Sequence, residues 1–223
     1  MPTRLQYELE QLKKSILTLG AAAEEALHLA VKALQERDEK IAQKIIEADE
    51  EIDQMEVDLE EECLKLLALH QPVATDLRFI VAVLKINNDL ERIGDLAVNV
   101  AERAKFLAFQ PVISLTLDFS SMASAVQKML KMSLDALVNM DAKLACEVMD
   151  ADDNVDQMNR EMYALIQSEI VKNPEQIGSL IHLLSTSRHL ERIGDQTTNI
   201  AEDVIYMIEG KIVRHKTEDY RKK

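Results

Sequence analysis

Apolar residues recur along the chain every three or four positions, with charged residues between them. The first such run extends from about residue 5 to residue 35, and its apolar positions begin with Leu5, Leu9, Leu12, Ile16 and Leu19. This spacing predicts a long amphipathic helix. Similar runs follow to the far end of the chain, and we therefore expect an all-α fold.

Residues that begin and end helices divide these runs into six helical segments of about 25 to 35 residues each. The expected starts are marked by Asp38 and Asp141 as N-caps, and by Asn173, which is followed by Pro174 and by Gln176 at the capping-box position. The expected ends are marked by Pro72, by Gln110-Pro111 and by Gly210. The segment from Pro111 to Thr116 then links the third and fourth helices.

The chain contains an internal duplication. Residues 90–102 read LERIGDLAVNVAE and residues 190–202 read LERIGDQTTNIAE, which are identical at nine of 13 positions. Upstream, ADEEIDQM at 48–55 matches ADDNVDQM at 151–158. Each copy holds three long helices with short turns, which must pack antiparallel. We therefore predict two tandem three-helix bundles, residues 1–110 and 111–223, related by approximate internal symmetry.

Composition supports this fold and narrows the function. Gly and Pro are scarce, with 5 and 4 residues, and good helix formers dominate. The net charge of −14 leaves no large basic patch for nucleic acid and disfavours adhesion to anionic lipid. The basic residues at the end of the chain are interpreted as a solvated tail. Neither a signal core nor a membrane-spanning run is visible, so we expect a cytoplasmic protein that meets a membrane only through partners.

Cys63 and Cys146 both lie among apolar helical residues. Their positions are not equivalent in the two copies, and no CxxC spacing is present. We expect two buried free thiols rather than a disulfide or a metal site.

The repeated motif carries the candidate chemistry. At about 100° per residue, the Glu, Asp, Asn and Glu of LERIGD…N.AE fall on one stripe within about 80°, and a second acidic stripe precedes each motif. The candidate metal ligands are Asp49, Asp53, Glu91, Asp95, Asn99 and Glu102 in the first copy, and Asp152, Asp156, Glu191, Asp195, Asn199 and Glu202 in the second. Like charges four residues apart destabilise a helix by about 0.2–0.5 kcal/mol per pair, which a cation would offset. Such hard oxygen donors suit magnesium, manganese, calcium or ferric iron.

Each LERIGD motif also holds a mid-helix glycine, Gly94 or Gly194. Because glycine costs about 1 kcal/mol in a helix relative to alanine, its presence in both copies indicates a close approach, by a neighbouring helix or by a ligand. The acidic stripes have two further interpretations. They are compatible with a solvated acidic surface and with a contact surface for a basic partner.

An enzyme is the less favoured interpretation. A ferritin-like di-metal oxidase needs two Glu-x-x-His motifs on facing helices, and only Glu25-Ala-Leu-His28 is present, with His28 expected to be partly buried. His189 superficially resembles a phosphoacceptor, but Asp89 takes its place in the first copy. No phosphate-binding glycine loop or nucleophile–base pair is evident. A metal-storage bundle and a passive helical adaptor stay open as alternatives.

With the paired LERIGD…N.AE segments 100 residues apart, the chain closely resembles the PhoU family of phosphate-uptake regulators over nearly its whole length. The resemblance implies two three-helix bundles and a negative regulator of the phosphate-starvation response. It also implies coupling of a phosphate ABC transporter, through its ATPase subunit, to a sensor histidine kinase.

The resemblance further implies metal ions at the acidic motifs, such as iron, manganese, magnesium, zinc or nickel. The implied first site is Asp49, Asp53, Glu91 and Asp95, and the second is Asp152, Asp156, Glu191 and Asp195, with the Asn and Glu positions named above as additional ligands. The family often has His after the Asp of the second motif, where this chain has Gln196, so a site that needs an imidazole is not expected there. A homodimer is compatible with the sequence, which does not determine the oligomeric state.

Overall fold

The computed structural model describes residues 4–113, 115 and 117–213. These residues form six α-helices and one short 3₁₀ turn, and no strands. The helices are α1 (Arg4–Glu36), α2 (Glu39–His70), α3 (Ala74–Ala108), α4 (Phe119–Asn139), α5 (Ala142–Lys172) and α6 (Ile177–Glu209), with the 3₁₀ turn η1 (Pro174–Gln176) before α6. The predicted all-α fold is confirmed, although α4, with 21 residues, is shorter than expected.

The N-caps of α2 and α5 form as predicted. One carboxylate oxygen of Asp38 accepts hydrogen bonds from the backbone N–H groups of Lys40 and Ile41, at 2.8 and 3.1 Å. Asp141 makes the same two bonds at the start of α5. These bonds satisfy N–H groups that have no partner within the helix. The duplicated helices therefore begin in the same way in both copies.

The ends of α2 and α6 also follow the sequence. Gln71, in the left-handed conformation, ends α2 directly before Pro72, and Gly210 ends α6 with φ of 70°. The predicted capping box at Asn173 is wrong. The Asn173 side chain instead donates to the Glu169 carboxylate in α5, at 2.5 Å, and leaves η1 without a side-chain cap.

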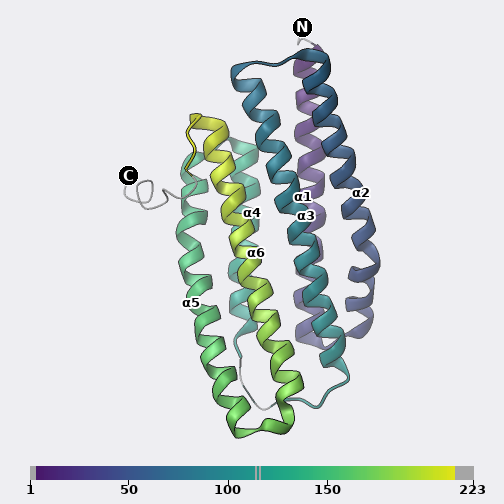
Figure 1. Ribbon diagram of the computed structural model, residues 1–223, viewed down its shortest axis with the longest axis vertical. Helices are drawn as coiled ribbons and strands as arrows, with labels where there is room; N and C mark the ends of the chain where they lie inside the picture. The colour runs from purple at the N-terminus through teal and green to yellow at the C-terminus, as the bar shows by residue number, and fades with distance from the viewer. Residues whose placement is uncertain (1–3, 114, 116, 214–223) are drawn as a thin grey trace.

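The two bundles lie side by side, and the helices of both run roughly along the long axis of the molecule (Figure 1). Helices α1, α2 and α3 form one bundle, and α4, α5 and α6 form the other. Between the bundles, α3 packs against α6 along much of its length, and α1 makes a smaller contact with α4. The predicted boundary near residue 110 falls in the segment that joins α3 to α4. Within this segment, Ser114 and Thr116 of the predicted linker lie outside the described residues, as does the basic tail from Arg214 onward.

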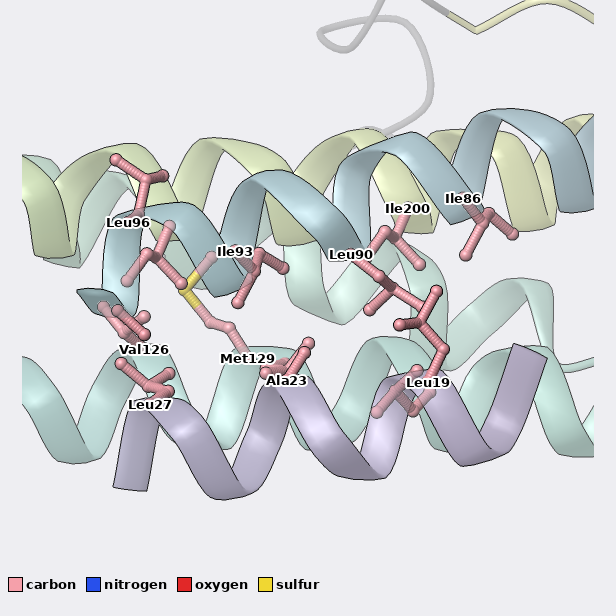
Figure 2. Packing of buried hydrophobic residues seen from close by; sticks show 14 of the residues in the cluster. Leu19, Ala23, Leu27, Ile86, Leu90, Ile93, Leu96, Val126, Met129 and Ile200 are labelled. Carbon is pink, nitrogen blue, oxygen red and sulfur yellow. The ribbon is translucent and has the colours of Figure 1, made fainter. Parts of the chain in front are cut away.

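One hydrophobic core continues through both bundles. Figure 2 shows Leu19 and Leu27 of α1, Ile93 of α3, Met129 of α4 and Ile200 of α6 within the same packed cluster. Each amphipathic helix buries its apolar stripe, as the spacing predicts. Because α3 and α6 contact helices on more than one side, they carry more buried positions than α2 and α5.

The structure corrects two expectations about single residues. His28 is exposed rather than partly buried, and its Nδ1 lies 3.5 Å from Nε2 of Gln127 on α4. Cys63 is fully buried, whereas Cys146 is only partly buried. Both thiols are free, as predicted.

Candidate functional site

The acidic stripes of α2 and α3 meet in the first bundle. Asp49, Asp53 and Glu56 on α2 lie close enough to Glu91 and Asp95 on α3 for their charges to interact across the two helices. Asp49, Glu56 and Glu91 are half-buried, while Asp53 and Asp95 are exposed. We call these five residues the first acidic array.

The carboxylates of the first acidic array repel one another. Burial raises the pKa of Asp49, and the neighbouring Asp53 and Asp95 raise it further. Burial and then Asp95 and Asp53 likewise raise the pKa of Glu91, which Arg92 partly offsets. The pKa of Asp95 is raised by partial desolvation of its carboxylate and by Asp53. These carboxylates therefore favour any cation that neutralises them.

A second acidic array forms between α5 and α6 and consists of Asp152, Asp156, Glu191 and Asp195. Burial raises the pKa of Glu191, with further contributions from Asp195 and Asp156. Burial and Asp156 raise the pKa of Asp195. Here Asp156 has a counter-charge, because Arg160 Nη1 lies 3.4 Å from its carboxylate. The second array therefore carries less uncompensated negative charge than the first.

The two motif glycines explain how the helices approach. A methyl group on Gly94 would lie 3.1 Å from Cγ2 of Ile52 and 3.9 Å from Oδ1 of Asp49. A methyl group on Gly194 would lie 3.3 Å from Oδ1 of Asp152. In each bundle, glycine thus lets the preceding helix pack close to the motif helix. This close packing is what brings the two acidic stripes together.

The remaining candidate ligands lie differently in the two copies. Asn99 Nδ2 donates to the backbone oxygen of Asp95 within its own helix, at 2.8 Å. Glu102 is exposed, with its carboxylate 3.3 Å from Arg103. Glu202, by contrast, is only 8% exposed. Together with Asn199, it lines a polar cavity of about 700 Å³ between α3 and α6.

Two polar features of the α3–α6 contact were not predicted. Lys85 Nζ on α3 lies 2.8 Å from Oδ1 of the buried Asp203 on α6, and it also lies 5.1 Å from the ring centre of Tyr206. The repeat gives no signal for this pair, because Arg103 takes the place of Asp203 in the first copy and Ser185 takes the place of Lys85 in the second. Glu56, whose helical spacing places it on the same acidic stripe as Asp49 and Asp53, joins the first array although it was not among the candidate ligands.

Two side chains near the second array point into the interior. Gln196, directly after Asp195, is buried, and its Oε1 has no hydrogen-bond partner. His189 is partly buried, and its Nδ1 is buried without a hydrogen bond. Burial, together with Arg103 and two further arginines, lowers the pKa of His189 to about 4. A partly buried imidazole is typical of a packing residue, whereas a phosphoacceptor must be accessible to its phosphate donor.

The acidic arrays fit a metal in their chemistry, since carboxylate oxygens are hard donors. Oδ1 of Asp49 is also buried without a hydrogen bond. Among the residues that the structure describes, however, no three His, Cys, Asp or Glu side chains converge closely enough to hold a metal ion. The structure thus brings the predicted donors onto facing helices without joining them in a coordination sphere.

Comparison with known proteins identifies the family. The PhoU domain matches residues 16–104 and again residues 119–204, one match for each bundle. The chain belongs to the PhoU family. The two matches coincide with the internal duplication and cover most of the described helices.

Relatives and solved structures agree with this assignment. A phosphate-specific transport system accessory protein PhoU homolog from Aquifex aeolicus is 37% identical, with 95% of this chain and 96% of the relative aligned. The homolog of the same name from Pseudomonas aeruginosa is 39% identical, over 93% and 86% of the two chains.

Among solved structures, PhoU from Pseudomonas aeruginosa superposes with a TM-score of 0.91 at 37% identity, covering 93% of this chain and all of that one. The phosphate transport system regulatory protein PhoU from Streptococcus pneumoniae gives a TM-score of 0.84 at 30% identity, over 94% and 99% of the chains. The predicted PhoU-like pair of three-helix bundles is confirmed.

Along the residues that the structure describes, no helix combines the length and the apolar character needed to cross a membrane.

Proposed function

We propose that this protein is a negative regulator of phosphate uptake and of the phosphate-starvation response. In this role it acts in the cytoplasm and couples the ATPase subunit of a phosphate ABC transporter to a sensor histidine kinase. The observation that carries the proposal is the match of the PhoU domain to both repeats. It is supported by relatives named accessory proteins of the phosphate-specific transport system and by a solved relative named a phosphate transport system regulatory protein.

The proposal assigns regulation to helix surfaces rather than to catalysis. Long helices that share one continuous core form a stiff body, through which contact at one bundle can be transmitted to the other. The protein would meet the membrane through its partners. A homodimer would be compatible with this arrangement.

We further propose that the acidic arrays hold metal ions. Asp49, Asp53, Glu91 and Asp95 would hold a metal in the first bundle, and Asp152, Asp156, Glu191 and Asp195 would do so in the second. An ion such as iron, manganese or magnesium would supply positive charge and fix the spacing of the helices. It would thereby offset the repulsion that raises the pKa of Asp49, Glu91, Asp95, Glu191 and Asp195.

The first test is a phosphate-starvation reporter in a strain that lacks this gene and its paralogues, grown in abundant phosphate. We expect the reporter to rise in the deletion strain and to fall when the chain is expressed again. A reporter that stays silent in the deletion strain would contradict the regulatory proposal.

The arrays are tested in the same strain by the double substitution Asp95→Ala and Asp195→Ala. If the metal sites act in regulation, this variant fails to silence the reporter and binds less metal by elemental analysis. The control is Glu50→Ala with Glu147→Ala, two exposed acids outside the arrays, one in each copy, which should silence the reporter normally. Full silencing by the array variant would favour the helical adaptor without a metal role.

Metal storage is the second candidate, because the acidic arrays gather hard donors without a catalytic histidine pair. It predicts that the deletion strain has an unchanged reporter but an altered content of cellular metal. An assay with ferrous iron and oxygen separates storage from a ferritin-like oxidase, for which we expect no turnover.

A further inference from the structure

An open groove runs between α1 and α2 in the first bundle, and its lining includes Asp49 of the first acidic array and Val98 of α3. One part has a volume of about 270 Å³ and is walled by Ala22, Ala26 and Leu29 of α1 and by Ala48 and Met55 of α2. The other part, of about 230 Å³, is lined by Ser15 and Thr18 of α1 and by Asp58 and Glu62 of α2. Met55 lines both parts, so they form one continuous depression.

The dimensions of the groove fit a helix. On α2 it extends from Lys44 to Glu62, which is about 27 Å at 1.5 Å per residue. Small alanines on α1 and α2 make its walls low, and the buried Ile45 and Ile52 form its apolar floor. A helix laid between two neighbouring helices buries an apolar face in this way.

The rim of the groove is acidic. Glu25, Glu51, Asp58 and Glu62 border it, and Lys44 is the basic residue among its lining side chains. The charge extends along α2, because residues 47–62 contain ten Asp or Glu and no Lys or Arg. The matching residues of the second copy, 150–165, contain five acids and Arg160. The excess of negative charge on α2 is therefore specific to the first copy and is not a feature of the repeat.

We propose that this groove docks an amphipathic helix of a partner protein, with apolar residues on one face and Lys or Arg along its flanks. The apolar floor would take the hydrophobic face, and the acidic rim would pair with the basic flanks and speed association. Met55, at the middle of the groove, is a flexible side chain suited to different partner surfaces. The inference deepens the proposed function, because a regulator that couples two proteins needs such a contact surface.

The test uses the full chain and two synthetic peptides of 20 residues. One peptide places leucines on one helical face and lysines on the other, and its control replaces every lysine by glutamate. Fluorescence anisotropy should show binding of the lysine peptide alone, with an affinity that falls as salt increases.

Variants distinguish docking in the groove from general attraction to an acidic protein. The pair Glu51→Gln and Asp58→Asn removes two charges from the rim, while Glu50→Gln and Glu61→Gln removes two from exposed positions of the same helix that do not line the groove. The rim variant should bind the lysine peptide about 3- to 10-fold more weakly. The control pair should bind within about twofold of the unmodified chain. Equal weakening by both pairs overturns the proposal.

The apolar floor is tested separately. Ala26→Leu fills the groove, and Ala21→Leu adds the same side chain at an exposed position of α1 outside it. Ala26→Leu should weaken binding of the lysine peptide and Ala21→Leu should not, with helicity and thermal midpoint unchanged in both. If the rim or floor variants change the oligomeric state in light scattering, the groove joins two copies of this chain and the proposal of a basic partner helix is wrong.

These outcomes are independent of the proposed function. Peptide binding is measured with the purified protein, whereas the regulatory role is measured with the reporter. A silent reporter in the deletion strain contradicts the regulatory role whatever the peptide result. A responsive reporter with rim and control variants that bind alike contradicts the groove proposal alone.

Discussion

Gly94 lies where α2 presses against the motif helix α3. Its missing side chain leaves room for Ile52 and brings Asp49 toward the stripe of Glu91 and Asp95. Gly178, in the first turn of α6, has no atom within 4 Å of the position that a methyl group would occupy. Comparing substitutions at these two glycines therefore separates the effect of close packing from the ordinary preference of a helix for alanine.

We predict that Gly94→Ala lowers the free energy of unfolding by about 1 kcal/mol, because the crowding at Ile52 outweighs the gain in helix propensity. Gly178→Ala should raise it by about 0.5 kcal/mol, since only the propensity gain remains. Denaturation by urea measures both. Stabilisation by Gly94→Ala would show that the tight contact with Ile52 relaxes without cost.

At the scale of the elements, α2 and α3 pack together although carboxylates of like charge face one another across their contact. The folded chain raises the pKa of Asp49, Glu91 and Asp95, and it therefore binds protons more readily than the unfolded chain does. Stability linked to these groups is highest at low pH and is lost as pH rises from their ordinary values through the raised ones.

We predict that, with a metal chelator at pH 7, Asp49→Asn raises the free energy of unfolding by about 0.5–1 kcal/mol, because repulsion from Asp53 and Asp95 is removed. The gain should vanish below the ordinary pKa of 3.8, where the unmodified carboxyl is protonated in both states. Urea titrations at the two pH values measure this difference. Glu50→Gln, outside the array, should change little, and destabilisation by Asp49→Asn at pH 7 in chelator would contradict the prediction.

At the scale of the whole molecule, α3 and α6 join the two bundles. The core runs through both bundles without interruption, and the Lys85–Asp203 pair at 2.8 Å bridges the same helices. Asp203 is only 3% exposed, so Lys85 supplies a counter-charge to a buried carboxylate. The bundles should therefore unfold together rather than one after the other.

We predict that Lys85→Met lowers the free energy of unfolding by about 2 kcal/mol, because it leaves the Asp203 carboxylate buried without this cation. Adding Asp203→Leu to Lys85→Met should recover part of the loss. Circular dichroism and tyrosine fluorescence should report a single coincident transition in all three proteins. Two separated transitions would show that the shared core does not couple the bundles.

Local chemistry explains which predictions from the sequence succeeded. The helices, the caps at Asp38 and Asp141 and the end at Gly210 depend on spacing and on residues a few positions apart, and they are visible in the sequence. The acidic stripes and their glycines follow from helical periodicity repeated in two copies. The capping box at Asn173 failed because Glu169, in the preceding helix, bonds the same side chain.

Tertiary packing decided the rest. Glu102 and Glu202 occupy the same motif position, yet one is exposed and the other is buried at the α3–α6 contact. The Lys85–Asp203 bridge, the exposure of His28 and the groove between α1 and α2 likewise depend on which helix lies opposite. By itself, the sequence determined six amphipathic helices, their duplication and their acidic stripes, because these arise from local periodicity. Which polar positions are buried, such as Glu202 and Asp203, was decided only when the two bundles packed together, because that burial depends on contacts between residues far apart in the chain.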